Sequence, residues 1–415
     1  MKDAFREKAV QSLILARYTR GGPYILETLI TVLTGEFVLL KDSATDGWLF
    51  ISTILRIAMR MGYHRDPDHF AGISPFEGEM RRRIWTTILQ LDLSLSLEMG
   101  LPRNATDTHI DTKQPSNLRD CDFDEDTSEM PPLRPETEWT PILPLIARGR
   151  LITALGLICD VNTDINPLSY EQVLKVDALL EDVHNRAIPP VLRWGTKPNA
   201  ITDSPNLVVQ RISVETTYYK SRILLYRRSL ISYPGRQAQE QGRESVRICL
   251  DSALKILSFQ EMLHEESRPF GRLCQLRWKV THIFNQDVLL ATSVLCLYLQ
   301  DVDKFELNDL AGQTTRLPRA EEIRQQLTIS HKIWLQMSTT SAEAGKVAKA
   351  LSIVLENTEA TGDDRDGPVS YDFQTDLGTV PLNEFGTTFT NESDFPPGFY
   401  SPLTFFDNVL ETWGS

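Results

Sequence analysis

The chain has 415 residues, of which 41% are hydrophobic, and a net charge of -13. It is long enough to bury a sizeable core and to hold two or three domains. Because binding to phosphates requires clustered Lys and Arg, this acidic composition argues against an extended nucleic-acid-binding surface.

The N-terminal part of the chain carries helical patterns. Apolar residues at three- and four-residue spacing predict helices over residues 2–19, 24–34 and 48–61. Gly62 stands where a left-handed C-terminal cap is expected. The segment Ser74-Pro75-Phe76-Glu77 combines a capping Ser, a Pro at the first helical position and a Glu three residues after the Ser. It predicts a long helix that ends at Gly100.

The rest of the body consists of one long loop and further helices. Residues 101–138 lose the helical period and collect Pro, Asn and Asp, which indicates a loop. Ser169 and Gln172 form a second capping box. Strand patterns are almost absent, so we predict an all-α fold, an irregular multi-helix bundle over residues 1–356. The other helices are expected at about 139–160, 207–231, 243–264, 272–299, 321–337 and 341–356.

Residues 357–415 differ in kind from this body. From Glu356 to the end, twelve Asp and Glu face a single cation, Arg365, and ten aromatic residues lie among them. This composition predicts a disordered acidic tail. Alternating acidic and aromatic residues are typical of an activation segment that binds the apolar groove of a partner, whereas an inert solvated tail is usually poor in aromatics. The candidate activation helix follows Ser401-Pro402 and contains Phe405, Phe406, Val409, Leu410 and Trp413.

Motifs for catalysis, metal binding and membrane insertion are missing from the sequence. The five cysteines are scattered and never spaced C-x-x-C, so neither a disulfide framework nor a zinc site is indicated. There is no G-x-S-x-G, P-loop or G-x-G-x-x-G motif. No apolar run reaches the roughly 18 residues that span a bilayer. We therefore expect no enzyme, no cofactor in this chain and no membrane contact.

Three consecutive arginines, Arg81, Arg82 and Arg83, resemble a basic patch. Successive residues of a helix point about 100° apart, so these three do not form one phosphate-binding face. Glu77 and Glu79 lie near enough in the sequence to pair with some of them. We therefore expect a structural role for the three arginines.

Two acidic features contain residue types that also occur in catalytic or metal-binding sites. Asp92 lies on roughly the same helical face as Arg81 and Trp85, so we expect a buried ion pair with an arginine rather than an isolated catalytic acid. Residues 363–366 superficially resemble the metal-binding aspartates of prenyl-diphosphate enzymes. They lie between glycines in a polar tail, which argues against that chemistry.

Residues 62–67 read Gly-Tyr-His-Arg-Asp-Pro, and residues 79–85 of the following helix read Glu-Met-Arg-Arg-Arg-Ile-Trp. Together this turn and helix resemble the fungal-specific transcription factor domain, the middle homology region of binuclear zinc-cluster regulators. Members of that family carry an L-G-L-H-R-D-P turn and an E-x-R-R-R-x-W-W helix. Here Tyr63 replaces the usual Leu and Thr86 replaces the second Trp. The similarity extends through residues 100–103 and 115–123, with weaker agreement later. The residues that carry the motif are His64, Arg65, Asp66, Pro67, Glu79, Arg81, Arg82, Arg83, Trp85 and Asp92.

The resemblance implies an all-α regulatory domain and transcriptional control in the nucleus, often of secondary-metabolite gene clusters. Family members usually begin with six cysteines that bind two zinc ions and read DNA, and the 415 residues here contain no such segment. Zinc is therefore expected only if an upstream cluster exists, and DNA contact only through such a segment or indirectly through a partner. The implied partners are coactivators that bind the tail and zinc-cluster factors that form a homodimer or heterodimer.

Two other classes of function stay open. The chain is alternatively an adaptor or inhibitor that does not bind DNA and pairs with intact zinc-cluster factors. A small-molecule sensor or an enzyme built on the same helices is the third class, although no residue in the sequence specifies a ligand.

Overall fold

A computed structural model describes most of the body of the chain. In this part every regular element is a helix and no strand is present, which confirms the predicted all-α class. The residues that the structure describes are 2–39, 44–164, 169–194, 203–231, 239–302, 316–339 and 341–360.

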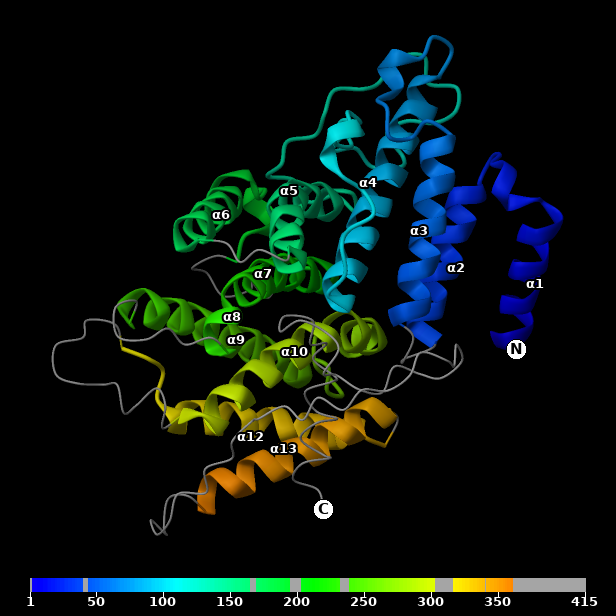
Figure 1. Ribbon diagram of the computed structural model, residues 1–415. Helices are drawn as coiled ribbons and strands as arrows, with labels where there is room; N and C mark the ends of the chain where they lie inside the picture. The colour runs from blue at the N-terminus through cyan, green and yellow to red at the C-terminus, as the bar shows by residue number, and fades with distance from the viewer. Residues whose placement is uncertain are drawn as a thin grey trace, which may run out of the picture.

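The helices form an irregular bundle (Figure 1). The N-terminal helices α1 to α3 lie on one side of the long helix α4, and α5 packs against its other side. α7 packs on α9, α9 on α10, and α12 pairs with α13. The bounds are α1 Lys2–Leu15, α2 Ile25–Leu39, α3 Ala44–Arg60, α4 Pro75–Met99, α5 Leu143–Thr163, α6 Tyr170–Asp182, α7 Pro205–Tyr226, α8 Arg228–Ile231, α9 Gln239–Glu266, α10 Arg277–Gln300, α12 Ala320–Met337 and α13 Ala342–Ala360.

Helix α4 contributes to two separate hydrophobic cores. Trp85 and Ile88 pack into a core shared with α1, α2 and α3. Leu93 and Leu97 pack into the larger core that α5 to α13 form. α5 approaches α4 closely, since a Cβ added to Gly149 would lie only 3.2 Å from Cγ2 of Thr86. A helix buried on two sides in this way has no simple apolar stripe.

The predicted helix signals are confirmed where they are local. Ser74 accepts a hydrogen bond from the backbone N–H of Glu77, and the Glu77 side chain accepts one from the N–H of Ser74. Ser169 and Gln172 form the same box at the start of α6. Gly62 adopts φ +81° and Gly100 φ +66°, a left-handed conformation that costs glycine little.

Several predicted boundaries are wrong. The first helix ends at Leu15 rather than near residue 19, because Arg17 takes a left-handed conformation before a short 3-10 turn. The helix predicted over 207–231 is divided at Arg227 into α7 and α8. The helix predicted from 272 begins only at Arg277, after another 3-10 turn.

The long loop and the C-terminal end of the body also differ from their predicted limits. The loop contains a short 3-10 turn at Asp107–His109 and continues to residue 142, because α5 begins at Leu143. α13 runs past residue 356 to Ala360. The acidic tail and its candidate activation helix lie outside the described residues beyond that point.

The prediction that no apolar run is long enough to span a bilayer is wrong for one stretch of α10. Ile283–Gln300 is long and apolar enough to cross a membrane by length and composition. However, 67% of this stretch is buried inside the bundle, and Leu289, Ala291, Leu295 and Cys296 are fully enclosed. Such burial is typical of the core helix of a bundle.

Candidate functional site

The residues of the family motif lie where the turn after α3, the first half of α4 and the long loop meet. The turn places Asp66 as the N-cap of a 3-10 turn, with Pro67 buried behind it. Gly78 of α4 lies against Pro67, since an added Cβ would be 3.4 Å from the Cβ of that proline. This close approach brings the acidic turn within reach of the arginines of α4.

Asp66 is the centre of the first ion-pair network. Its side chain is only 2% exposed and accepts two hydrogen bonds from Arg82, at 3.0 and 2.7 Å. The backbone N–H groups of Asp68 and Lys113 donate two more, at 3.1 and 2.8 Å. Burial alone would raise the pKa of Asp66, but these hydrogen bonds outweigh it and hold the pKa well below its usual range.

The same network ties the long loop to the turn. Asp111 of the loop accepts hydrogen bonds from the backbone of Asp66 at 2.8 Å and from His69 at 2.9 Å, and it pairs with Arg65 at 2.9 Å. The Lys113 ammonium lies 2.6 Å from Asp68. The loop is therefore fixed at this end by backbone and side-chain contacts together.

Glu79 and Arg83 form a second network one turn further along α4. Glu79 is 1% exposed. Its carboxylate accepts one hydrogen bond from Arg83 at 2.9 Å and another from the backbone N–H of Ser116. Arg83 also donates to Asp120 at 2.7 Å and to the carbonyl of Leu118 at 2.9 Å. Its guanidinium lies 4.9 Å from the centre of the Phe123 ring. The predicted pairing of Glu79 with one of the three arginines is confirmed.

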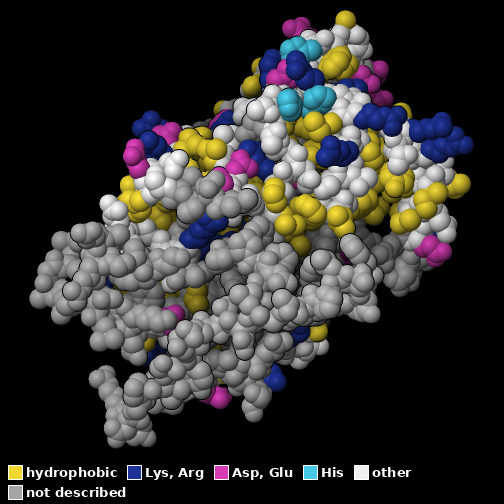
Figure 2. Space-filling view, viewed as in Figure 1, with side chains coloured by type: hydrophobic (Ala, Val, Ile, Leu, Met, Phe, Trp, Pro, Cys, Tyr) yellow, Lys and Arg dark blue, Asp and Glu magenta, His cyan; other side chains and the backbone are white. Residues whose placement is uncertain are grey.

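The three arginines do not gather on one surface. Arg82 faces the turn, Arg83 faces the loop, and Arg81 lies over the Tyr63 ring at 4.9 Å from its centre. Figure 2 shows basic and acidic side chains side by side at this end of the molecule. A surface of mixed sign does not attract a phosphate backbone in the way that a basic patch does.

His64 and Trp85 belong to the apolar side of the motif. Trp85 is 1% exposed in the smaller core, and the His64 ring lies 6.3 Å from it, centre to centre. The Nδ1 atom of His64 and the Nε1 atom of Trp85 are buried without a hydrogen-bond partner. These two residues therefore support packing.

The expected ion pair between Asp92 and an arginine is wrong. Asp92 is 1% exposed and accepts hydrogen bonds from the side-chain amide of Asn104 at 2.7 Å and from the backbone N–H groups of Asn104 and Ala105, each at 3.0 Å. The nearby Arg103 pairs with Asp160 of α5 instead. Burial raises the pKa of Asp92, although these hydrogen bonds oppose the rise. Asp92 holds the start of the long loop.

Sequence reasoning missed a third polar cluster, between α4, α7, α10 and α13. Lys220 lies 2.7 Å from Asp287, and Gln286 donates to Glu343 at 3.2 Å. Burial raises the pKa of Glu98; Lys220 opposes the rise, whereas Asp287 and Glu343 add to it. These residues are distant in the sequence, so their contacts could not be predicted. The only sequence sign of a buried pair was the presence of Lys220 and Asp287 in largely apolar helices.

The buried carboxylates of the motif region serve as hydrogen-bond acceptors within the fold. Asp66, Glu79 and Asp92 each accept from an arginine, an asparagine or backbone N–H groups. Among the described residues no group of three or more His, Cys, Asp or Glu is placed to hold a metal ion. What the region can do is join the turn, α4 and the loop into one rigid unit.

The fold and this motif are matched by a known family. Residues 23–176 match the family model of the fungal specific transcription factor domain. Residues 23–176 of the chain are a fungal specific transcription factor domain. The matched segment begins before α2 and ends within α6, so it contains all three parts that the ion-pair networks join. No solved structure matches the chain.

Curated relatives are similar to the chain far beyond the matched segment. The fusarisetin A cluster transcription factor of Fusarium sp. (strain FN080326) is 41% identical over 99% of this chain and 53% of its own length. The equisetin cluster transcription factor of Fusarium heterosporum is 41% identical over 96% of the chain and 53% of its own length. The pyrrolocin cluster transcription factor of Fungal sp. (strain NRRL 50135) is 42% identical over 85% of the chain and 46% of its own length. The chain spans about half the length of these curated relatives.

Proposed function

We propose that this chain is the regulatory part of a pathway-specific transcription regulator that acts in the nucleus on a biosynthetic gene cluster. The observation that carries the proposal is the similarity over nearly the whole chain to three proteins named as cluster transcription factors. Arg82 and Arg83 of the motif are paired with the carboxylates of Asp66 and Glu79. Because these arginines are not free to bind phosphates, they support a regulatory rather than a DNA-reading role for this part. An enzyme is not the function we propose.

The test is genetic and is done in the native host. The gene is deleted and overexpressed, and transcripts of the biosynthetic genes beside it are measured against those of unlinked genes. We expect the neighbouring cluster to lose expression on deletion and to gain it on overexpression. Unchanged cluster transcripts in both strains would contradict the proposal.

We further propose that the acidic tail carries the activating function by binding a coactivator. Because α13 runs to Ala360, the deletion that tests this begins at residue 361, so that the last helix stays whole. The activator loses its effect on transcripts when residues 361–415 are removed. An adaptor or inhibitor that pairs with zinc-cluster factors keeps its effect.

A fusion tests the tail by itself. Residues 361–415 are joined to a foreign DNA-binding domain, and a reporter gene is measured. A matched variant carries Phe405→Ala, Phe406→Ala and Trp413→Ala, which removes the aromatic groups and leaves the charge unchanged. We expect activation by the native segment and a strong loss in the variant, because the aromatic groups supply the apolar contact with the partner. Equal activation by both would contradict an aromatic docking mechanism.

DNA contact is a separate proposal. We propose that it is made through a six-cysteine zinc segment encoded upstream or through a partner that carries one. Sequencing the native transcript from its 5′ end decides between the two routes. An in-frame upstream exon with six closely spaced cysteines indicates the first, and its absence indicates the second.

A further inference from the structure

Four arginines gather where the turn after α1 meets the C-terminal end of α3. Arg17 directly precedes the short 3-10 helix of this turn, and Arg20 ends it. Arg56 and Arg60 lie four residues apart at the end of α3, so they share one face of that helix. Arg60 joins the two elements, because its guanidinium donates to the backbone carbonyls of Thr19 and Arg20, the latter at 3.1 Å. We call Arg17, Arg20, Arg56 and Arg60 the arginine cluster.

The charges of the arginine cluster are not neutralised by carboxylates of the described residues. All four side chains are exposed, and within the described part of the chain none of them forms an ion pair. Three acidic side chains are described in α1 to α3. Glu7 lies two turns before the end of α1, Asp46 lies at the start of α3, and Glu27 is half-buried in the first turn of α2. An exposed group of like charges attracts a segment of opposite charge.

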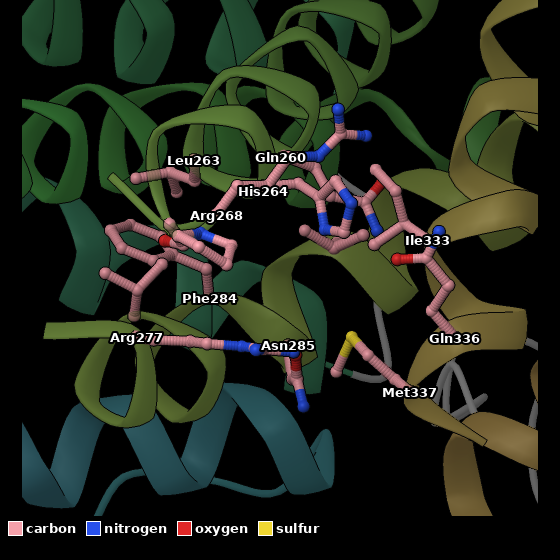
Figure 3. A pocket seen from close by; sticks show the side chains of 14 residues that line it. Gln260, Leu263, His264, Arg268, Arg277, Phe284, Asn285, Ile333, Gln336 and Met337 are labelled. Atoms are coloured by element: carbon pink, nitrogen blue, oxygen red, sulfur yellow. The ribbon is translucent and has the colours of Figure 1, made fainter. Parts of the chain in front are cut away.

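Many arginines elsewhere in the described body are already held by partners. Arg82 and Arg134 lie 2.7 and 2.6 Å from carboxylate oxygens. Figure 3 shows Arg268 and Arg277 beside a pocket of about 240 Å³ between α9, α10 and α12. Arg268 is paired with Glu265 at 2.9 Å, and Arg277 also has a partner. The arginine cluster is therefore a better candidate than this pocket for binding an acidic group.

Exposed apolar side chains lie on the same elements as the arginine cluster. Leu49 lies seven residues before Arg56 on one exposed stripe of α3, and it is 56% exposed. Leu15, which ends α1 just before the turn, is 83% exposed, and Tyr24, which follows the turn, is 69% exposed. Figure 2 shows basic and hydrophobic side chains together over the N-terminal helices, with few acidic ones among them on this face. This surface fits a partner that is both acidic and rich in apolar side chains.

The chain itself contains a segment with this chemistry. Residues 361–415 contain ten Asp and Glu against a single Arg, together with ten aromatic residues. The segment follows α13, which ends at Ala360. Its first forty residues span up to about 130 Å when extended, whereas a compact chain of this length has a radius of gyration of about 22 Å. The residues after 400 can therefore reach the arginine cluster, and the covalent link gives them an effective concentration on the order of millimolar.

We propose that the arginine cluster and the apolar side chains beside it bind the acidic tail, residues 361–415, of the same chain. Carboxylates of the tail lie against the arginines, and Phe405, Phe406 and Trp413 lie against the exposed apolar residues of α1 and α3. A docked tail is withheld from a coactivator, so release of the tail switches the regulator on. This last step rests on the activating function proposed above for the tail, whereas the docking itself does not.

Hydrogen exchange of the whole chain tests the docking, with mass spectrometry of the peptides from residues 361–415. The test variant combines Arg17→Gln, Arg20→Gln and Arg56→Gln. It keeps Arg60, because the hydrogen bonds of that side chain hold the turn on α3. The matched control combines Lys175→Gln, Arg186→Gln and Arg268→Gln, which removes three charges from side chains that are 71%, 82% and 55% exposed elsewhere on the surface.

At about 50 mM salt we expect the amides of residues 401–415 to exchange about tenfold more slowly in the native chain than in an isolated peptide of that sequence. The test variant should lose this protection, and the control should keep it. Salt gives a second test that needs no substitution, because the Debye length falls to about 3 Å at about 1 M and protection in the native chain should then be lost. Protection should not depend on protein concentration, since the tail binds its own chain.

Three results would overturn the docking. The first is exchange as fast as in the isolated peptide, or protection that the test variant retains. The second is protection that rises with protein concentration, because the tail then binds a second copy of the chain. The third is a random-sequence DNA duplex that binds the native chain and loses affinity in the test variant while the tail shows no protection, since the arginine cluster then binds phosphates.

A reporter assay separates the docking from the activating function. The whole chain, the test variant, the control and residues 361–415 alone are each joined to a foreign DNA-binding domain. We expect the test variant to activate more strongly than the native chain and the control. If residues 361–415 alone fail to activate, the activating function is wrong, and the exchange data still decide the docking. If they activate but the native chain and the test variant activate equally, the withholding of the tail is wrong.

Discussion

Removal of the Asp66 carboxylate tests whether the motif is a structural clamp. In Asp66→Ala the Arg82 guanidinium loses two hydrogen bonds and keeps only Asp68, at 2.8 Å, while the backbone N–H groups of Asp68 and Lys113 lose their acceptor. Removing one partner of a buried ion pair lowers the free energy of unfolding by about 3–5 kcal/mol. Because Asp68 remains, we expect the lower end, about 3 kcal/mol of the free energy of unfolding.

The assay is equilibrium unfolding in urea, with Asp182→Ala as the matched control. Asp182 forms an exposed pair with Arg186 four residues away, so its loss should cost at most about 0.5 kcal/mol. Limited proteolysis within residues 101–142 should become faster in Asp66→Ala only, since Asp66 holds Lys113 of that loop. A loss below about 1 kcal/mol, similar to that of the control, would refute the clamp.

The pH dependence of the same variant series follows from the lowered pKa of Asp66. The folded pKa lies below the unfolded value of about 3.9, so the unfolded state binds more protons in acid. The stabilisation by this carboxylate is therefore fully present above about pH 4 and is lost as the pH falls through the folded pKa. The difference in unfolding free energy between the native chain and Asp66→Asn should shrink below that pH. A difference that stays constant to about pH 3 would count against the ion pair.

Three further predictions concern the rest of the molecule. Ser74→Ala removes the cap of α4 and should lower the unfolding free energy by about 1 kcal/mol in urea, whereas a loss near zero would mean that the cap is not formed in solution. Trp334→Ala, at a site 1% exposed in the larger core, should cost about 3–5 kcal/mol in the same assay, and a cost below about 1 kcal/mol would contradict this packing. An aromatic disulfide reagent should modify the exposed thiols of the native chain quickly and the buried ones only after unfolding, because burial raises the pKa of the buried thiols. Cys121 and Cys274 are exposed, whereas Cys159, Cys249 and Cys296 are buried. More than two rapidly modified thiols would therefore contradict this burial.

The helix starts and ends were predictable where the deciding groups are close in sequence. The capping box of Ser74 and Glu77 and the left-handed Gly62 need only neighbours within a few residues. By contrast, α1 ends at Leu15 because Arg17 adopts a left-handed conformation. The sequence does not signal that conformation at an arginine in the way that it does at a glycine. Local chemistry thus predicted most elements and misplaced some boundaries.

The partners of the motif residues were harder to predict because they come from distant segments. Glu79 and Arg83 are four residues apart, and their pairing was expected. Arg83 also binds Asp120, and Asp92 binds Asn104, across turns whose path the sequence does not specify.

The two-sided burial of α4 has a consequence for how the chain unfolds. Trp85 and Leu93 lie on one rigid helix but in different cores, so neither core can lose its packing without disturbing the helix on which the other depends. Calorimetry should therefore record a single cooperative transition for the described helices, although their apolar side chains fall into two clusters. The same dependence makes α4 the physical connection between the N-terminal helices and α5.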